Sequence, residues 1–125
     1  CGTPSTTITL FTKYDPCGRP KEASYGSVTG RLRGLTHSLA LEQCKPNTQL
    51  NAILLGCYVT EMTGHLTDTP LADYLRGKTP AGRWGNPEDL VGTALLLAAS
   101  ASDFITGTAI PIDGGYSIAD RLLYD

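Results

Sequence analysis

Three short runs of apolar and β-branched residues constrain this chain more than any other feature. They are Thr7 to Phe11, Leu50 to Leu55 and Ala109 to Ile112. Runs of this length bounded by turn residues are typical of strands, and the near-continuous apolar run at Leu50 to Leu55 is typical of a strand covered on both faces. Pro111 favours a place at the edge of a sheet for the last run, because proline cannot donate to a neighbouring strand.

The segments between these runs carry helical patterns. Four apolar residues recur at spacings of four, three and four between Val28 and Leu39, which predicts a helix from about Ser24 to Cys44. Thr69-Pro70 and Asn86-Pro87 each place a capping side chain before a proline, so two more helices are predicted to begin there. Glu88-Asp89 falls in the first turn of the last helix, where acidic side chains complement the helix dipole.

The order of these elements indicates the fold class. A strand, a helix, a strand, helices and a final strand imply parallel pairing through right-handed crossovers, and therefore an α/β sheet. Three parallel strands are few, because a parallel sheet is normally buried on both faces by helices. The pattern therefore resembles half of an open α/β sheet. The single methionine is Met62, so we expect either that processing has removed a segment or that the chain is part of a longer polypeptide.

Charge and hydropathy exclude two classes of partner. The formal net charge is −2 and the sequence pI is about 5.6, so the chain lacks the positive field that binds a nucleic-acid backbone or an anionic membrane. The longest apolar run, Ala94 to Ala99, is far shorter than the roughly 20 residues that span a bilayer. We expect neither nucleic acid nor a membrane as a partner.

The cysteines and histidines indicate no metal site. Four cysteines lie at wide, irregular spacing without a C-x-x-C motif, and His37 and His65 stand alone. This pattern favours reduced thiols in a cytoplasmic protein over a zinc site or a disulfide framework.

Four linked motifs follow one another toward the C-terminus. They are Thr79 to Asp89 (T-P-A-G-R-W-G-N-P-E-D), Leu95 to Ala98, Ala101 to Gly107 and Asp113 to Gly115. In this order and spacing they closely resemble the C-terminal part of the short-chain dehydrogenase/reductase family, and most closely its members that act on sugar acids, polyols and similar alcohols or ketones. The resemblance extends from about Thr7 to Tyr116.

The resemblance implies the C-terminal half of a Rossmann-like, doubly wound parallel sheet, with residues 1–125 as part of an NAD(P)-binding domain. Family members are about twice this length. The absent half carries the Gly-rich turn that binds the cofactor phosphates, and no G-x-G-x-x-G cluster follows a strand in this sequence. The resemblance implies NAD or NADP as cofactor, without tight binding to this chain alone.

Three residues match the catalytic positions of the family by resemblance. Tyr25 takes the place of the tyrosine that exchanges a proton with the substrate oxygen, and Thr12 takes the place of the serine that orients the carbonyl. The family's lysine, which lowers the tyrosine pKa, is replaced by Thr29. A phenol of ordinary pKa is only about 0.1% ionised at pH 7, so alcohol oxidation should suffer more than ketone reduction. Arg33, one turn further along, is a poor substitute because its guanidinium lies about 6 Å away.

The segment after the second strand resembles the family's nicotinamide loop. Gly56 and Thr60 match that motif, with Thr60 in the place of the threonine that contacts the carboxamide, whereas Leu55 replaces a proline. Tyr58 stands where a small aliphatic residue usually packs on the nicotinamide. The alternatives are that Thr60 is a turn hydroxyl and Tyr58 a surface aromatic residue. The segment Gly64 to Lys78, which would cover the site, has no diagnostic residue.

The predicted 24–44 helix also carries a stripe of small residues. Gly26, Gly30 and Gly34 recur every four residues, each less favourable in a helix than alanine. Family dimers and tetramers use this helix at an interface, so the resemblance implies a homo-oligomer; ordinary packing within one chain is the alternative.

Two functional hypotheses follow. The first is an NAD(P)-dependent oxidoreductase that interconverts a secondary alcohol and a ketone of a sugar-acid or polyol substrate, seen as a partial chain. The alternative is a truncated, catalytically inactive relative that acts as a binding or assembly module. Loss of the lysine at Thr29 favours the alternative, whereas retention of Tyr25 and Thr60 favours the oxidoreductase.

Overall fold

The computed structural model describes residues 5–11, 23–43 and 48–119. In chain order the elements are β1 (Ser5–Phe11), α1 (Ala23–Glu42), β2 (Thr48–Leu55), the 3₁₀ turn η1 (Gly64–Leu66), α2 (Pro70–Lys78), η2 (Pro87–Leu90), α3 (Val91–Ala98), η3 (Ser100–Ser102) and β3 (Ala109–Ile112). Three of the nine lie where the apolar runs predict strands.

The three strands form one parallel sheet in the order β1-β2-β3. β1 pairs with β2 from Ser5 opposite Thr48 to Phe11 opposite Leu54, and β3 pairs with the second half of β2. β1 and β2 each begin two residues before the predicted apolar run, because backbone pairing continues into the polar residues ahead of it. β3 has the predicted bounds and, with Pro111, lies at an edge of the described sheet.

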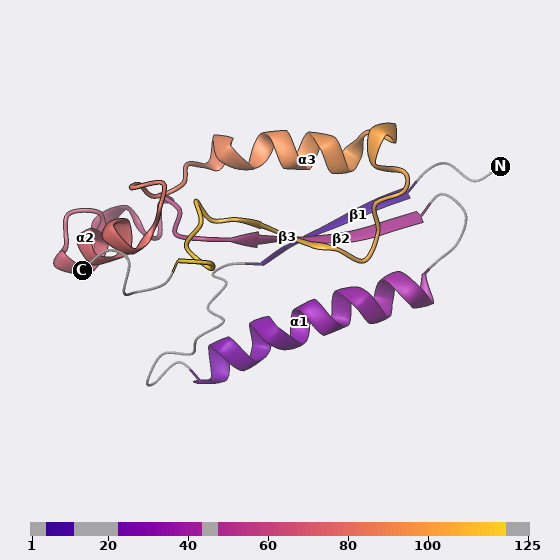
Figure 1. Cartoon of the computed structure of the whole chain (residues 1–125), viewed down its shortest axis with the longest axis horizontal. Helices are drawn as coiled ribbons and strands as arrows, with labels where there is room; N and C mark the ends of the chain where they lie inside the picture. The colour runs from indigo at the N-terminus through magenta and orange to yellow at the C-terminus, as the bar shows by residue number, and fades with distance from the viewer. Residues whose placement is uncertain (1–4, 12–22, 44–47, 120–125) are drawn as a thin grey trace.

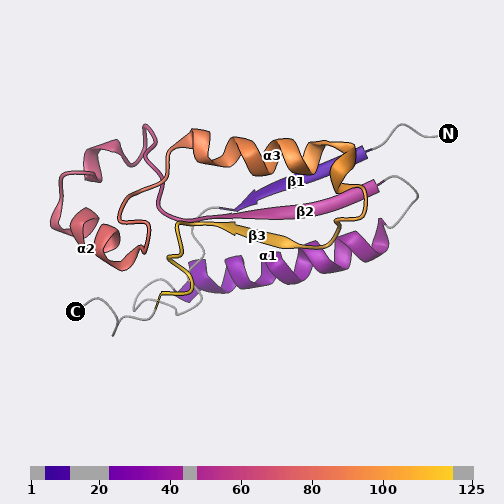
Figure 2. The same ribbon diagram turned by 45° about the horizontal axis from the view of Figure 1, so that its top comes forward.

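Helices cover the two faces of the sheet in separate layers. α1 lies on one face and α3 on the other, with the strands between them (Figures 1 and 2). The centre of β2 is fully enclosed: Ala52 and Ile53 are 0% exposed and Leu54 is 3% exposed. The parallel α/β class predicted from the element order is therefore confirmed.

α1 packs on the sheet through small side chains. Thr36 and Ala40 are buried, whereas Leu35, one residue of the predicted apolar stripe, is 48% exposed. A side chain at Gly107 would come within 3.3 Å of the Ala40 methyl group. Short side chains at this contact allow the helix to approach the sheet closely, and the larger leucine is displaced outward.

Both predicted helix starts are confirmed, with one difference. Thr69 accepts a hydrogen bond from the Ala72 amide at 3.3 Å, and α2 begins at Pro70. At the second site the first turn is a 3₁₀ turn, η2, and the α-helix α3 follows from Val91. The Asp89 amide donates to the Asn86 carbonyl at 2.9 Å, which closes the tighter turn.

The loop before β3 is held by polar side chains of β2. Asn51 is 0% exposed, donates from Nδ2 to the Ile105 carbonyl at 2.8 Å, and accepts at Oδ1 from the Thr108 amide at 3.2 Å. Gln49 donates to the Asp103 carbonyl at 3.1 Å. This polar clamp at the amino end of β2 directs the chain into β3, and it leaves the opposite end of the sheet for the site.

Candidate functional site

The candidate site lies where the parallel strands end. The first turn of α1, the segment after β2 and the turn after β3 all lie at this carboxyl end of the sheet (Figure 1). Tyr25 is the third residue of α1, and Thr29 is one turn further along the same helix. Thr12 lies outside the described residues, and the side chains of Tyr25 and Thr29 are not described. In open α/β sheets, ligands bind beyond the carboxyl ends of the strands.

Gly56 begins the predicted cofactor loop and packs directly on the turn after β3. Its amide donates to the Ile112 carbonyl at 3.3 Å. An added side chain would place its Cβ 2.7 Å from both Cα and Cβ of Asp113, so only glycine fits without a backbone shift. The Asp113 carboxylate accepts from the Gly115 and Ser117 amides, each at 2.9 Å, and so holds this turn.

Tyr58 anchors the loop by turning inward. Its residue is 9% exposed, and its hydroxyl donates to the Ile112 carbonyl at 2.8 Å, so it is not a surface aromatic residue. The backbone on either side of Tyr58 pairs with Gly85 in an isolated parallel bridge. The Val59 amide donates to the Gly85 carbonyl, and the Gly85 amide donates to the Cys57 carbonyl. Burial, together with the carboxylates of Asp89 and Asp113, raises the pKa of Tyr58, which therefore stays protonated.

Thr60 is exposed and belongs to a small hydroxyl chain. The Thr63 hydroxyl donates to the Tyr58 carbonyl at 2.6 Å and accepts from the Thr60 amide at 2.9 Å. The two hydroxyl oxygens of Thr60 and Thr63 lie 3.0 Å apart. Because Thr63 has only one hydroxyl hydrogen, the Thr60 hydroxyl donates to Thr63. The exposed oxygen of Thr60 therefore keeps its acceptor capacity for a ligand.

An ion pair, which the sequence motif did not reveal, braces the same end of the sheet. The Arg83 guanidinium binds both carboxylate oxygens of Asp89, at 2.7 and 2.9 Å, and also donates to the Trp84 carbonyl. The Arg83 hydrogen bond, reinforced by the Asn86 amide, lowers the pKa of Asp89 to about 2. The sequence motif could not predict this bidentate ion pair, because the spacing of residues along the chain does not show which carboxylate an arginine side chain binds.

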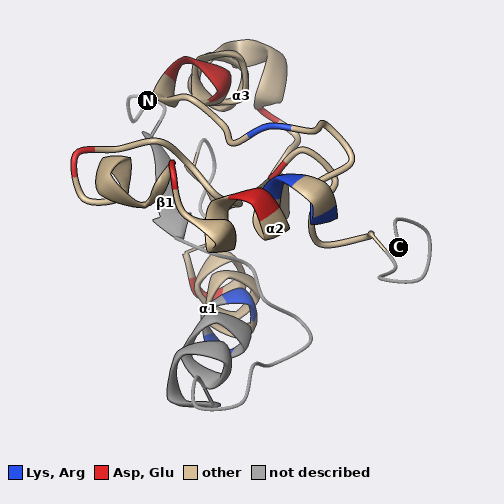
Figure 3. Ribbon diagram, turned by 90° about the vertical axis from the view of Figure 1, so that its left-hand side faces the viewer, with Lys and Arg blue, Asp and Glu red and all other residues tan. Residues whose placement is uncertain are grey.

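Tyr58, Asp113 and the ion pair of Arg83 with Asp89 line a small cavity of about 200 Å³. Its lining includes Cys57, Tyr58, Arg83, Asp89 and Asp113. Seen from the carboxyl end, acidic and basic positions are interspersed (Figure 3). Among the described residues, no group of three or more His, Cys, Asp or Glu side chains is placed to hold a metal ion.

The segment Gly64 to Lys78, predicted to cover the site, contributes to an apolar cluster outside the sheet. Ala72 and Leu75 of α2 are buried against Trp84 and Tyr116, and Lys78 Nζ lies 4.3 Å from the centroid of the Tyr116 ring. The Trp84 indole nitrogen is buried without a hydrogen-bond partner. This cluster ties the covering segment to the Arg83–Asp89 region, a connection that no local sequence signal predicted.

Comparison with known proteins decides the family. The model of the family described as Enoyl-(Acyl carrier protein) reductase matches residues 6–117. The chain belongs to the short-chain dehydrogenase/reductase family. It is 38% identical over 113 residues to gluconate 5-dehydrogenase of Gluconobacter oxydans, and 35% identical over 113 residues to 5-keto-D-gluconate 5-reductase of Escherichia coli K12. The sugar-acid type of relative expected from the motifs is confirmed.

The solved structures agree. The chain resembles the crystal structure of a gluconate 5-dehydrogenase from Burkholderia cenocepacia in complex with NADP and tartrate, with 34% identity and a TM-score of 0.82. The match covers 92% of this chain and 46% of that one. The matches to the two curated relatives named above likewise cover 90% of this chain and 44% of each relative's length. The chain therefore spans less than half the length of these relatives.

No helix among the described residues is long and apolar enough to cross a membrane.

Proposed function

We propose that residues 1–125 form the C-terminal part of an NAD(P)-binding Rossmann-fold domain, and that the complete enzyme interconverts a secondary alcohol and a ketone of a sugar acid in the cytoplasm. The observation that carries this proposal is the family match over residues 6–117, a range that includes both the loop Gly56 to Thr60 and helix α1, whose third residue is Tyr25. The relatives' names as sugar-acid dehydrogenases and reductases support the substrate class. They do not support the alternative of an inactive binding module.

The loop residues fit the nicotinamide end of the cofactor. The exposed Thr60 oxygen is an acceptor whose own hydrogen is donated to Thr63, as the two hydroxyl contacts require. It is suited to accept a hydrogen bond from a carboxamide N–H. Tyr58, which we predicted near the nicotinamide, supports the loop from within through its bond to the Ile112 carbonyl. No Gly-rich phosphate turn occurs in these 125 residues, so we expect the phosphates to be bound elsewhere.

The chemistry assigned to this chain is proton transfer. A bound reduced nicotinamide supplies the hydride. We propose that Tyr25 donates a proton to the ketone oxygen and that Thr12 orients that oxygen through its hydroxyl. With Thr29 in the place of lysine, no cation at that position favours the phenolate, and this suits a tyrosine that acts as an acid. We therefore expect ketone reduction to be faster than alcohol oxidation.

The first test is cofactor binding. NADPH and NADH are titrated by fluorescence into the chain alone and into the chain co-purified with the unmatched part of the Gluconobacter oxydans relative. We expect saturable binding only in the second case. Absence of binding by a folded complex would contradict the proposed function.

The second test restores the missing cation. We expect Thr29→Lys in that complex to raise the rate of alcohol oxidation by about tenfold or more, because a nearby ammonium favours the phenolate. Thr29→Met, of similar length but uncharged, is the matched control and should leave the rate unchanged. Equal rates for the two variants, measured by NADPH formation from gluconate, would show that Tyr25 is not the proton-transfer group.

A further inference from the structure

The Thr63 hydroxyl uses its whole hydrogen-bonding capacity within the turn that follows β2. It donates to the Tyr58 carbonyl at 2.6 Å, accepts from the Thr60 amide at 2.9 Å, and lies 3.0 Å from the Thr60 hydroxyl oxygen. The Thr60 carbonyl is 3.5 Å away, which is beyond the usual range for a hydroxyl donor. The single hydroxyl hydrogen of Thr63 therefore points to Tyr58, and its second lone pair accepts the hydrogen of Thr60.

The carbonyl that orients Thr63 is itself held in place by the sheet. Tyr58 is 9% exposed, and its hydroxyl donates to the Ile112 carbonyl of β3 at 2.8 Å. The next amide along the chain, that of Val59, donates to the Gly85 carbonyl at 2.9 Å. Bonds on both the side chain and the backbone fix the Tyr58 peptide, so the direction of the Thr63 hydroxyl is set from the sheet outward.

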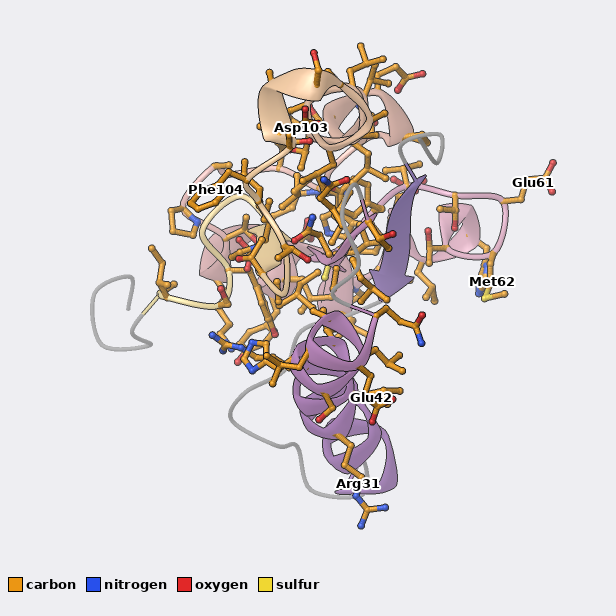
Figure 4. The ribbon with its side chains drawn as sticks, turned by 90° about the vertical axis from the view of Figure 1, so that its right-hand side faces the viewer. Arg31, Glu42, Glu61, Met62, Asp103 and Phe104 are labelled. Atoms are coloured by element: carbon orange, nitrogen blue, oxygen red, sulfur yellow. The ribbon has the colours of Figure 1, made fainter. Side chains whose placement is uncertain are left out.

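The turn separates its hydroxyl pair from its larger side chains. The amides of Thr63 and Gly64 donate to the Thr60 carbonyl at 3.1 and 2.8 Å and close the turn. Glu61 and Met62, which lie between the two threonines, are exposed and project away from the body of the molecule (Figure 4). Among the contacts of the described residues, Thr63 is therefore the side chain that orients the exposed Thr60 hydroxyl.

We propose that Thr63 is a positioning residue that makes the Thr60 hydroxyl a one-way hydrogen-bond acceptor. A free hydroxyl rotates, and so donates or accepts as its partner requires. With its hydrogen held by Thr63, Thr60 accepts from an N–H group, but it donates to a carbonyl only after that bond breaks. The loop therefore selects the amide N–H of a nicotinamide carboxamide over an acetyl group of similar shape. This inference rests on the proposed function for the identity of the ligand.

The ratio of two affinities tests the proposal. The chain, in complex with the unmatched part of Gluconobacter oxydans gluconate 5-dehydrogenase, is titrated in a calorimeter with NADPH and with its reduced 3-acetylpyridine analogue, in which a methyl group replaces the amide nitrogen. We expect Thr63→Val to weaken NADPH binding about tenfold, because the Thr60 hydroxyl is no longer oriented. The affinity for the analogue should stay the same or rise, because the released hydroxyl donates to the acetyl oxygen.

Two further variants are the controls. Thr63→Ser keeps the hydroxyl and should keep the ratio of affinities within about twofold of the unaltered chain. Thr67→Val removes a hydroxyl that donates to the Gly64 carbonyl at 2.8 Å, and it should change neither affinity. Equal weakening of both ligands by Thr63→Val would show that this hydroxyl only supports the fold of the loop, and would overturn the proposal.

A measurement without cofactor decides the case in which the complex does not assemble. In the chain alone, Thr63→Val should accelerate hydrogen exchange at the Thr60 amide about tenfold, whereas Thr63→Ser and Thr67→Val should leave it unchanged. Unchanged exchange in Thr63→Val would overturn the proposal. If exchange responds as expected but an assembled complex binds neither ligand, the proposed function is contradicted and the orientation of Thr60 by Thr63 stands.

Discussion

At the scale of single residues, two glycines admit the contacts that hold the candidate loop. Gly56 leaves room for the Asp113 backbone, and Gly85 leaves room for the Tyr58 ring. Neither glycine has a positive φ angle, so their role is close approach and not backbone conformation. The position of the loop that carries Thr60 therefore depends on the lack of a side chain at Gly56 and at Gly85.

Replacement of Gly85 by alanine should loosen this loop. The new Cβ would lie 2.7 Å from Cε1 of Tyr58, and we expect a loss of about 2 kcal/mol in the free energy of unfolding, as for other overpacked sites. Urea unfolding measures the loss. Gly64→Ala is the control, because nothing lies within 4 Å of its added Cβ, and it should change stability by less than about 0.5 kcal/mol. Equal effects would show that the Tyr58 ring moves aside freely.

At the scale of elements, short-range signals determine where helices begin, while packing determines which face is buried. Thr69-Pro70 starts α2 as its residue types predict. In α1, by contrast, Thr36 and Ala40 are buried and Leu35 is half exposed, although leucine is the more apolar residue. Periodicity identifies the helix, but the shape of the surface beneath it selects the buried face.

Removal of the α2 cap should destabilise the segment that we predict to cover the site. Thr69 accepts from the Ala72 amide and donates to the Leu66 carbonyl at 2.6 Å, so Thr69→Ala should cost about 1 kcal/mol. Thr69→Ser keeps the hydroxyl and should retain most of that stability. Chemical unfolding followed by circular dichroism measures both variants. If serine were no better than alanine, the cap would not be the source of the stabilisation.

At the scale of the whole molecule, the two ends of the sheet have different roles. The amino end is closed by Asn51, whose amide joins β2 to a loop 54 residues away in the chain. The carboxyl end holds the loop Gly56 to Thr60 and the ion pair of Arg83 with Asp89. A rigid amino end fixes the register of β3, and thereby the Ile112 carbonyl on which Tyr58 depends.

Loss of the two Asn51 hydrogen bonds should therefore lower the stability of the whole molecule. Asn51→Ala leaves the Ile105 carbonyl and the Thr108 amide without these partners, and we expect a loss of about 3 kcal/mol in unfolding free energy. Amide exchange at Thr108 should accelerate as well. Gln43→Ala, which removes an exposed amide side chain, is the control and should have little effect. A stable Asn51→Ala variant with unchanged exchange would show that the loop is held by other contacts.

Much of the fold could be predicted from local patterns. The runs that became β1, β2 and β3 were recognisable because apolar residues cluster over short distances, and Pro111 indicated an edge for the same local reason. The motifs from Thr79 to Gly115 indicated the family. Of the candidate site, the catalytic roles of Tyr25, Thr12 and Thr29 stay predictions. The cofactor roles of Gly56, Tyr58 and Thr60, which the family motif suggested, stay predictions as well.

The sequence by itself determined the order and type of the elements, the parallel α/β class and the family. Only the tertiary structure decided that Tyr58 turns inward to Ile112, that Arg83 meets Asp89, and that Asn51 clamps a distant loop. The physical reason is range. Strand and helix patterns depend on residues within a few positions of one another, whereas Tyr58 and Asn51 each bond to a carbonyl 54 positions away, which only the folded chain brings within reach.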